Sequence, residues 1–295
     1  GTAYDIFGTH KKLYVYSEGN FFDATPQRST ADITSVFTTT NTSSLVTVTH
    51  TNHGASEGDY VTISSTSAAT AGISAAIMDD EHEIQSITDT NNYVIDVGTN
   101  ATSAVSTTND CTVTYEIQAG RNRALSGYGW GTGTWDSANT WDTPNTSDSV
   151  TIALRSWALD NWGEDIIALD IDAGIYVWDT SGGISTASNL ASAISNAPTK
   201  SKFTLVSNPD RHLICFGTET TIGTTSTQDP MFIRWSDQDD YTSWTATATN
   251  SAGSQRVTGG SKIVTAVSTR GQILFLTDTS AHGMSFIGAP FTFGF

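Results

Sequence analysis

The sequence predicts an all-β protein: a β-propeller, incomplete in this chain, with a small β-barrel or sandwich domain inserted into it. Three observations lead to this fold class. Helical periodicity is nearly absent along the 295 residues. Short runs that alternate apolar and polar residues are separated by turn-forming residues throughout, as in antiparallel sheets. A strand–turn–strand pattern also recurs at a period close to that of propeller blades, roughly 40 to 50 residues.

The chain divides into three stretches by composition. Residues 1–31 contain the apolar hairpin "HKKLYVYSEGNFFDAT", which we assign to the propeller. Residues 32–119 are rich in Thr and Ser, lack Trp and contain alternating runs such as "SLVTVTHTNHG" and "CTVTYEI", which predicts the inserted β-domain. Residues 120–295 return to strands rich in aromatic residues and are assigned to propeller blades.

The blade pattern repeats three times after the insert. Apolar strand, turn and a second strand ending in Asp occur in Glu164–Asp179, Asp210–Asp237 and Ser261–Asp278. With the insert set aside, the chain has room for about four blades, at the low end for propellers. The one helical candidate is Thr186–Asn196, with Leu190 and Ile194 spaced by four residues, and it is long enough for one or two turns.

Charge and cysteine content exclude several classes of function. Thirty acidic residues against 13 basic ones give a net charge of −17, which disfavours wrapping of nucleic acid and docking on anionic lipid. DNA passing through an acidic channel remains compatible, because like charge keeps the duplex from sticking. Cys111 and Cys215 predict small packed side chains rather than a disulfide framework. No run approaches the ~20 apolar residues of a membrane helix, so no membrane anchor is expected.

The segment "SNPDRHLICFG" (207–217) places Asp210, Arg211, His212 and Cys215 close together. A Cys/His catalytic pair would need a third orienting group, and the sequence shows none. The alternative is structural: a turn leads into a blade strand, Cys215 shares a face with Leu213, and His212 stands where other copies of the repeat have Ile166 and Ile263.

Two further groups allow either a metal site or a turn. His50 and His53 could join His82 at a zinc site, but "NHG" favours a turn, and residues three apart point to opposite faces of a strand. Asp170 and Asp172 could bind Ca²⁺, but the glycine that follows them favours a hairpin turn. We therefore predict no catalytic, cofactor-binding or metal-binding residue.

Aromatic and acidic residues gather in two loops. "GYGWGTGTWDSANTW" could stack on sugars, but we expect it to pack against blades or a neighbouring subunit, through Tyr128, Trp130, Trp135 and Trp141. "RWSDQDDYTSW" nearly matches the Asp-box turn of sialidase-type propellers, with altered spacing and no Gly. Its Asp237, Asp239 and Asp240 are candidates for lining a channel.

The sequence resembles the phage stabilisation proteins, tail hub proteins of short-tailed phages. The resemblance rests on "NAPTKSKFTLVSNPDRHLICFGT", on "RWSDQDDYTSW" with the following "TNSAG" and "GSKIV", on "FIGAPFTFG", and on "KKLYVYSEGNFFDAT" near the start. It covers about residues 155–295. The insert, through "VTVTHTNHGASEGDYVTIS" and "EHEIQSI", is similar to a small β-module of phage tail proteins.

The resemblance implies a virion protein of the phage tail that is not an enzyme. Such a hub or nozzle forms a homo-oligomeric ring, expected to be a hexamer, next to the portal, its adaptor and other tail proteins. The ring closes the head, retains packaged double-stranded DNA without sequence-specific binding, and forms part of the ejection channel. The chain is shorter than is usual for this family, which leaves its exact position in the tail open. The alternative is a receptor- or glycan-binding propeller that recognises a host surface glycan through the insert and the Trp-rich loop; a propeller glycosidase ranks third.

Overall fold

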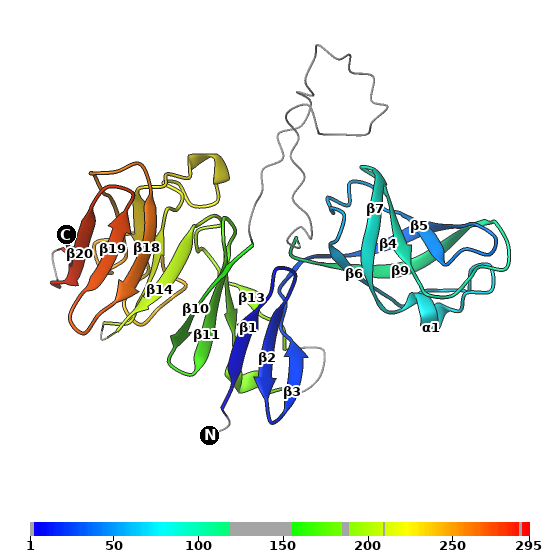
Figure 1. Ribbon diagram of the computed structural model, residues 1–295, viewed down its shortest axis with the longest axis horizontal. Helices are drawn as coiled ribbons and strands as arrows, with labels where there is room; N and C mark the ends of the chain where they lie inside the picture. The colour runs from blue at the N-terminus through cyan, green and yellow to red at the C-terminus, as the bar shows by residue number, and fades with distance from the viewer. Residues whose placement is uncertain (1–2, 119–154, 185–188, 209, 289–290) are drawn as a thin grey trace, which may run out of the picture. The chain divides into compact units, whose positions relative to one another are not determined.

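The computed structural model describes residues 3–118, 155–184, 189–208, 210–288 and 291–295 (Figure 1). These residues are almost entirely β-structure, as the sequence predicts. The chain forms two compact units: the first combines Gly1–Gln27 with Ser156–Phe295, and the second is Arg28–Arg155. The sequence predicts an inserted domain over residues 32–119, close to these bounds. Among the described residues, no helix is long and apolar enough to cross a membrane.

The second unit is a closed six-stranded barrel, so the small inserted β-domain is a barrel rather than a sandwich. Its strands follow the order β4-β5-β8-β7-β6-β9 around the barrel. Their bounds are β4 Gln27–Thr39, β5 Leu45–Thr49, β6 Tyr60–Ser64, β7 Glu81–Asp89, β8 Asn92–Asp96 and β9 Ser106–Glu116. A single helical turn, α1 (Ala75–Met78), precedes β7 and buries Met78 in the barrel core.

The alternation of inward and outward residues along β4 and β9 explains the Thr-rich composition of the barrel. Inward-facing residues such as Phe37 on β4 and Val113 on β9 form the core. The outward residues of the same two strands hydrogen-bond across the seam that closes the barrel, which stabilises the strand pairing. These pairs are Thr30 with Thr114, Asp32 with Thr112, Thr34 with Asp110, and Thr38 with Ser106, at 2.6–3.1 Å.

The first unit contains four antiparallel sheets that follow one another along the chain. The first has three strands, β1 (Asp5–Gly8), β2 (Leu13–Ser17) and β3 (Asn20–Asp23). The second consists of β10 (Trp157–Trp162), β11 (Asp165–Asp170), β12 (Ile175–Trp178) and β13 (Ser192–Ala193). The third consists of β14 (Phe203–Ser207), β15 (His212–Phe216), β16 (Phe232–Trp235) and β17 (Gly253–Arg256). The fourth consists of β18 (Ile263–Ser268), β19 (Ile273–Thr277), β20 (Ala281–Phe286) and β21 (Phe293–Gly294). In the described part of the first unit, short 3-10 turns occupy Thr180–Gly182 and Thr225–Thr227.

Neighbouring sheets pack face to face through separate apolar clusters. Leu13 and Val15 of β2 pack against Ile166 and Ala168 of β11. The opposite face of β11 packs on the third sheet, and the third sheet packs on the fourth through its other face. Each inner sheet is therefore apolar on both faces, which explains why β15 is buried along its whole length.

Two expectations from the sequence are corrected. The hairpins of Glu164–Asp179 and Asp210–Asp237 are the second and third strands of their sheets, whereas Ser261–Asp278 contains the first and second strands of the fourth sheet. The residue that corresponds to His212 is therefore Ile273, not Ile263. The helix expected over Thr186–Asn196 is wrong for its described part: β13 extends the second sheet there. Edge pairing to β12 outweighs the weak helical signal of a short, Ser-rich segment.

Candidate functional site

The segment 207–217 is a structural turn and strand. Ser207 Oγ donates a hydrogen bond to Asp210 Oδ2 at 2.6 Å, and Arg211 adopts a left-handed conformation at the turn. His212 Nδ1 donates to the Ser236 carbonyl oxygen at 2.8 Å. The His212 ring contacts Phe293 of the fourth sheet.

A nucleophilic Cys215–His212 pair is excluded by the geometry of β15. His212 faces the fourth sheet, whereas Cys215 lies with Leu213 in the cluster between the second and third sheets. The two side chains therefore point to opposite faces of β15 and cannot meet. Complete burial also raises the pKa of the Cys215 thiol to about 12, so the reactive thiolate is suppressed.

The three candidate channel residues lie in the loop that joins β16 to β17. Asp237 Oδ1 accepts hydrogen bonds from Ser251 N and Oγ at 2.8 and 2.6 Å. Asp240 Oδ1 accepts from Thr242 N and Oγ1. Asp239 forms an exposed ion pair with Arg211, with 62% of its side chain accessible. Asp237 and Asp240 therefore stabilise turns, whereas the Asp239 carboxylate extends into solvent.

The aromatic end of the same loop anchors two sheets. Trp244 is buried between the second and third sheets and donates from Nε1 to the Tyr241 carbonyl oxygen at 2.7 Å. Trp162 of β10 lies in the same cluster. The Asp-box-like sequence therefore forms a turn, as expected, and its Trp244 also makes an inter-sheet contact. The interface candidates Tyr128, Trp130, Trp135 and Trp141 lie outside the described residues.

The His50–Gly54 segment is a turn at one end of the barrel, as predicted. Asn52 and Gly54 have positive φ angles. His53 uses both ring nitrogens, because Nδ1 accepts from Ala55 N and Nε2 donates to the Asp89 carbonyl oxygen. His50 Nδ1 lies 2.8 Å from the Tyr115 hydroxyl. Burial, then the neighbouring His53 and Arg28, lower the pKa of His50.

Asp172 stabilises the turn between β11 and β12 rather than a cation site. Its φ angle is positive, and its carboxylate accepts from Lys202 Nζ at 2.5 Å and from Gln228 Nε2 at 2.9 Å. Burial acts to raise the pKa of Asp172, but the Lys202 and Gln228 hydrogen bonds outweigh it and lower the pKa. The predicted hairpin turn is confirmed.

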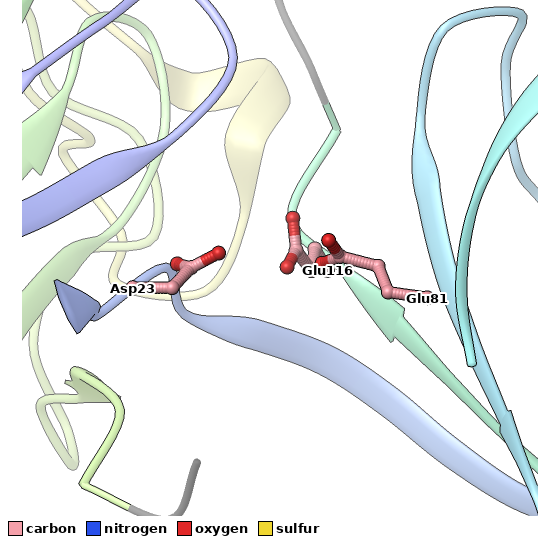
Figure 2. Close-up of side chains that lie close together, drawn as sticks. All are labelled: Asp23, Glu81 and Glu116. Atoms are coloured by element: carbon pink, nitrogen blue, oxygen red, sulfur yellow. The ribbon is translucent and has the colours of Figure 1, made fainter. Parts of the chain in front are cut away.

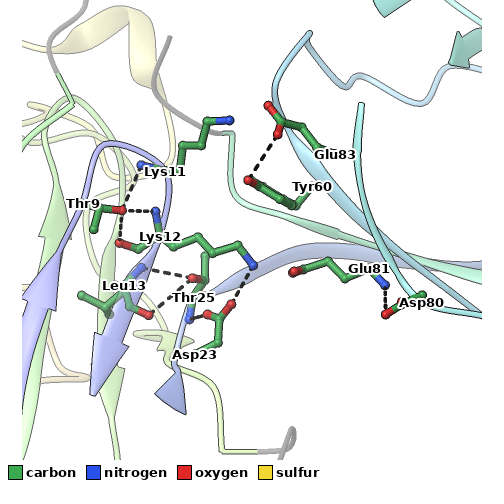
Figure 3. A network of polar contacts seen from close by, with 10 residues as sticks. All are labelled: Thr9, Lys11, Lys12, Leu13, Asp23, Thr25, Tyr60, Asp80, Glu81 and Glu83. Atoms are coloured by element: carbon green, nitrogen blue, oxygen red, sulfur yellow. Dashed lines mark hydrogen bonds and ion pairs between the residues drawn. The ribbon is translucent and has the colours of Figure 1, made fainter. Parts of the chain in front are cut away.

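Figure 2 shows the side chains of three more carboxylates, Asp23, Glu81 and Glu116. Asp23, in the first unit, accepts from Lys12 Nζ at 2.7 Å and from Thr25 N at 2.9 Å (Figure 3). Glu81 begins β7 and Glu116 ends β9 in the barrel. Asp23 and Lys12 therefore join the β1–β2 turn to the end of β3.

The outer faces of the first and fourth sheets carry exposed apolar side chains. One carries Phe7, Tyr14, Tyr16 and Phe21, whose rings contact one another at centroid distances of 4.9–6.5 Å. The other exposes Val264, Val267 and Leu276. We call them the aromatic end face and the aliphatic end face. Sequence reasoning missed both, although the alternation in "LYVYS" already separates two apolar faces.

Comparisons with known proteins give a weak structural likeness. No protein-family model and no curated protein matches the sequence. Among solved structures, phage phi92 endosialidase matches with a TM-score of 0.27 and 12% identity, over 99% of this chain. The chain spans 42% of the length of that protein.

Proposed function

We propose that the four sheets of the first unit are consecutive blades of a β-propeller arc, and that the protein is a structural component of a short phage tail that acts by assembly into a ring. The single observation that carries this proposal is the stack of sheets in chain order, each packed on the next by an apolar face. The sequence resemblance to tail hub proteins supplies the biological context.

The arrangement of the first strands supports radial stacking. β10, β14 and β18 are the first strands of their sheets, and each contacts the next. An edge strand leaves some backbone N–H groups without a hydrogen-bond acceptor on another strand of its own sheet. Here a side chain of the neighbouring sheet supplies an acceptor. Asp160 of β10 accepts a hydrogen bond from the backbone N–H of Val206 on β14 at 2.7 Å. Edge-to-edge contacts of this kind are expected where the innermost strands of propeller blades converge.

The acidity of the chain supports a role as a DNA conduit. A net charge of −17 favours passage over retention of a polyanion. Asp239 gives the cleanest test of the channel-lining prediction, because its exposed pair with Arg211 contributes little to stability. In phage carrying Asp239→Lys, we expect slower DNA ejection if this loop faces the lumen. An unchanged ejection rate would remove this loop from the channel wall.

Electron microscopy of the particle or assembly that contains this chain tests the function directly. We expect a closed ring around an axial passage, in which the four sheets of each chain are radially arranged. A chain found free of any particle, with no ring, would overturn the tail proposal. A glycan array on the same preparation then addresses the receptor-binding alternative.

A further inference from the structure

The turn of residues 50–54, which we call the barrel-end turn, is hydrogen-bonded to both ends of the barrel. Arg28, near the start of β4, donates from Nη2 to the His53 carbonyl oxygen at 3.3 Å. Gln118, just after β9, donates from Nε2 to the Gly54 carbonyl oxygen at 3.3 Å. The turn therefore joins the points at which the chain enters and leaves the barrel.

Two of the six histidines of the chain lie in the barrel-end turn, and both contact tyrosines of the barrel core. His50 Nδ1 lies 2.8 Å from the Tyr115 hydroxyl, and the two rings stack with their centroids 5.7 Å apart. The His53 ring meets the Tyr93 ring edge to face at 5.1 Å. Tyr93 and Tyr115 are 0% and 1% exposed, and the Tyr115 hydroxyl donates to the Tyr93 hydroxyl at 3.2 Å. The turn is thus attached to the core through its imidazole rings.

The hydrogen bonds of His53 require a neutral ring. Its Nδ1 accepts from Ala55 N at 3.0 Å, and its Nε2 donates to the Asp89 carbonyl oxygen at 3.1 Å. A backbone N–H can only donate, so Nδ1 must keep its lone pair for this bond. A second proton on the ring would set two N–H groups against each other around a side chain that is 5% exposed. Protonation of His53 therefore breaks the bond that holds Ala55 after the turn.

A fixed positive charge lies beside these rings. Arg28 places its guanidinium over the Tyr115 ring, 4.8 Å from the centroid, and donates from Nε to the Glu116 carbonyl oxygen at 3.2 Å. It is the only lysine or arginine between the start of β4 and the end of β9. Burial, then the nearby His53 and Arg28, lower the pKa of His50. A proton on either histidine thus adds charge next to a cation that is always present, which like-charge repulsion opposes.

The Asp89 carboxylate, at the end of β7, acts in the opposite direction. It attracts positive charge on His53, but it is exposed and accepts hydrogen bonds from Asn91 N at 2.7 Å and Asn92 Nδ2 at 2.9 Å. Those bonds, first from Asn92, lower the pKa of Asp89, and the attraction of His53 is the smallest of the causes. Screening by solvent therefore leaves burial and the Arg28 charge as the larger effects on the turn.

We propose that the barrel-end turn is an acid-sensitive latch: protonation of His50 and His53 releases it from the core tyrosines and loosens both ends of the barrel. While both rings are neutral, the hydrogen bonds described above hold the turn in place. With both rings charged, the hydrogen bond at His53 Nδ1 is lost, and two imidazolium groups repel the Arg28 guanidinium. The strand ladder that closes the barrel does not include the turn, so the strands stay paired when the latch opens. The inference is independent of the proposed role in a phage tail.

Hydrogen exchange with mass spectrometry on the full chain tests the latch. The two conditions are about pH 7.5 and about pH 5, on either side of the ordinary histidine pKa of about 6.5, with correction for the intrinsic pH dependence of exchange. We expect the protection of residues 50–55 and 116–118 to fall about tenfold or more at the lower pH, the factor that corresponds to one unit of histidine pKa. The amides of β5 and β8 should keep their protection, because their pairing does not depend on the turn.

Variants identify the groups that respond to acid. The double variant His50→Gln, His53→Asn removes both titrating rings, and the asparagine side-chain oxygen can still accept from Ala55 N, as Nδ1 does. We expect its turn to be equally protected at both pH values. His82→Gln is the matched control, because His82 is also buried in the barrel but bonds to the Met78 carbonyl oxygen rather than to the turn. This control should keep the acid response of the wild type.

NMR of the imidazole nitrogens in the wild-type chain gives a second readout that requires no variant. We expect Nδ1 of His53 to be unprotonated at about pH 7.5, because it accepts from Ala55 N. Its protonation at lower pH should coincide with the loss of protection at residues 50–55.

Three results would overturn the latch. The first is equal protection of the wild-type turn at both pH values, and the second is an equal acid response in the wild type and the double variant. The third is loss of protection in β5 and β8 together with the turn, because the barrel would then unfold as a whole. None of these results bears on whether the protein resides in a phage tail, which electron microscopy of the particle decides.

Discussion

Replacing Trp244 with Ala tests whether the Asp-box-like loop holds the second and third sheets together. A buried aromatic side chain removes about 150–250 Å² from water, which at about 25 cal/mol per Å² corresponds to roughly 4–6 kcal/mol as an upper estimate. Trp244 is 1% exposed and also loses its hydrogen bond to the Tyr241 carbonyl oxygen. Partial collapse of the cavity reduces the cost, so we expect Trp244→Ala to lower the free energy of unfolding by about 3–5 kcal/mol.

Trp244→Phe is the matched control, because it keeps most of the apolar contact and removes the indole donor. We expect it to cost about 1–2 kcal/mol. Because the barrel is a separate compact unit, hydrogen exchange with mass spectrometry is the assay of choice. It follows the amides of β10 and β14 apart from those of the barrel. A loss below about 1 kcal/mol for Trp244→Ala would refute the assignment of this residue as an inter-sheet anchor.

Three further predictions concern single groups. Burial raises the pKa of the Cys111 and Cys215 thiols to about 11 and about 12, so both should resist a thiol-labelling reagent at neutral pH and react only on unfolding; rapid labelling of the native protein would contradict their burial. The pKa of His50 is lowered in the folded barrel, chiefly by burial, so the unfolded chain takes up a proton first as the pH falls. The free energy of unfolding of the barrel should therefore decrease as pH drops through 6.5. Urea unfolding one pH unit above and one below 6.5 should show a smaller decrease for His50→Gln than for the wild type, and an equal decrease would contradict this role of His50. Asp237→Ala should destabilise the first unit by about 1–2 kcal/mol through loss of its Ser251 and Gln238 hydrogen bonds, whereas Asp239→Ala should change it by less than about 1 kcal/mol; equal effects in thermal unfolding would contradict the different roles of these carboxylates.

Much of the fold could be predicted because period-two alternation is a local signal. The strands of the barrel, the turn at Asn52–Gly54 and the hairpin turn at Asp172 each depend on residues close in sequence. The sequence could not show which strands of a sheet each repeat contains. A hairpin that ends in Asp looks the same whether it is formed by the first and second strands or by the second and third. β13 has only two residues, too few to show any period.

The candidate surfaces were harder to predict than the strands. Whether the outward face of "LYVYS" meets another sheet or solvent depends on the number of sheets stacked against it, which no local pattern encodes. The carboxylates of Asp237 and Asp240 were correctly located in a loop, but their engagement by Ser251 and Thr242 depends on the folded course of that loop. Fold is encoded largely by local alternation, whereas the partner of a surface is not.

The insertion of the barrel between β3 and β10 determines the order in which the chain can fold during synthesis. The hydrogen bond from Trp157 Nε1 to the Thr9 carbonyl oxygen joins residues 148 positions apart. A ribosome that has made β1–β3 must therefore complete the whole barrel before the first sheet finds its neighbour. The barrel closes on itself and can fold early, while the sheet of β1, β2 and β3 waits for β11. During that delay the apolar residues Leu13 and Val15 of the nascent first sheet lack the partners on β11 that later bury them.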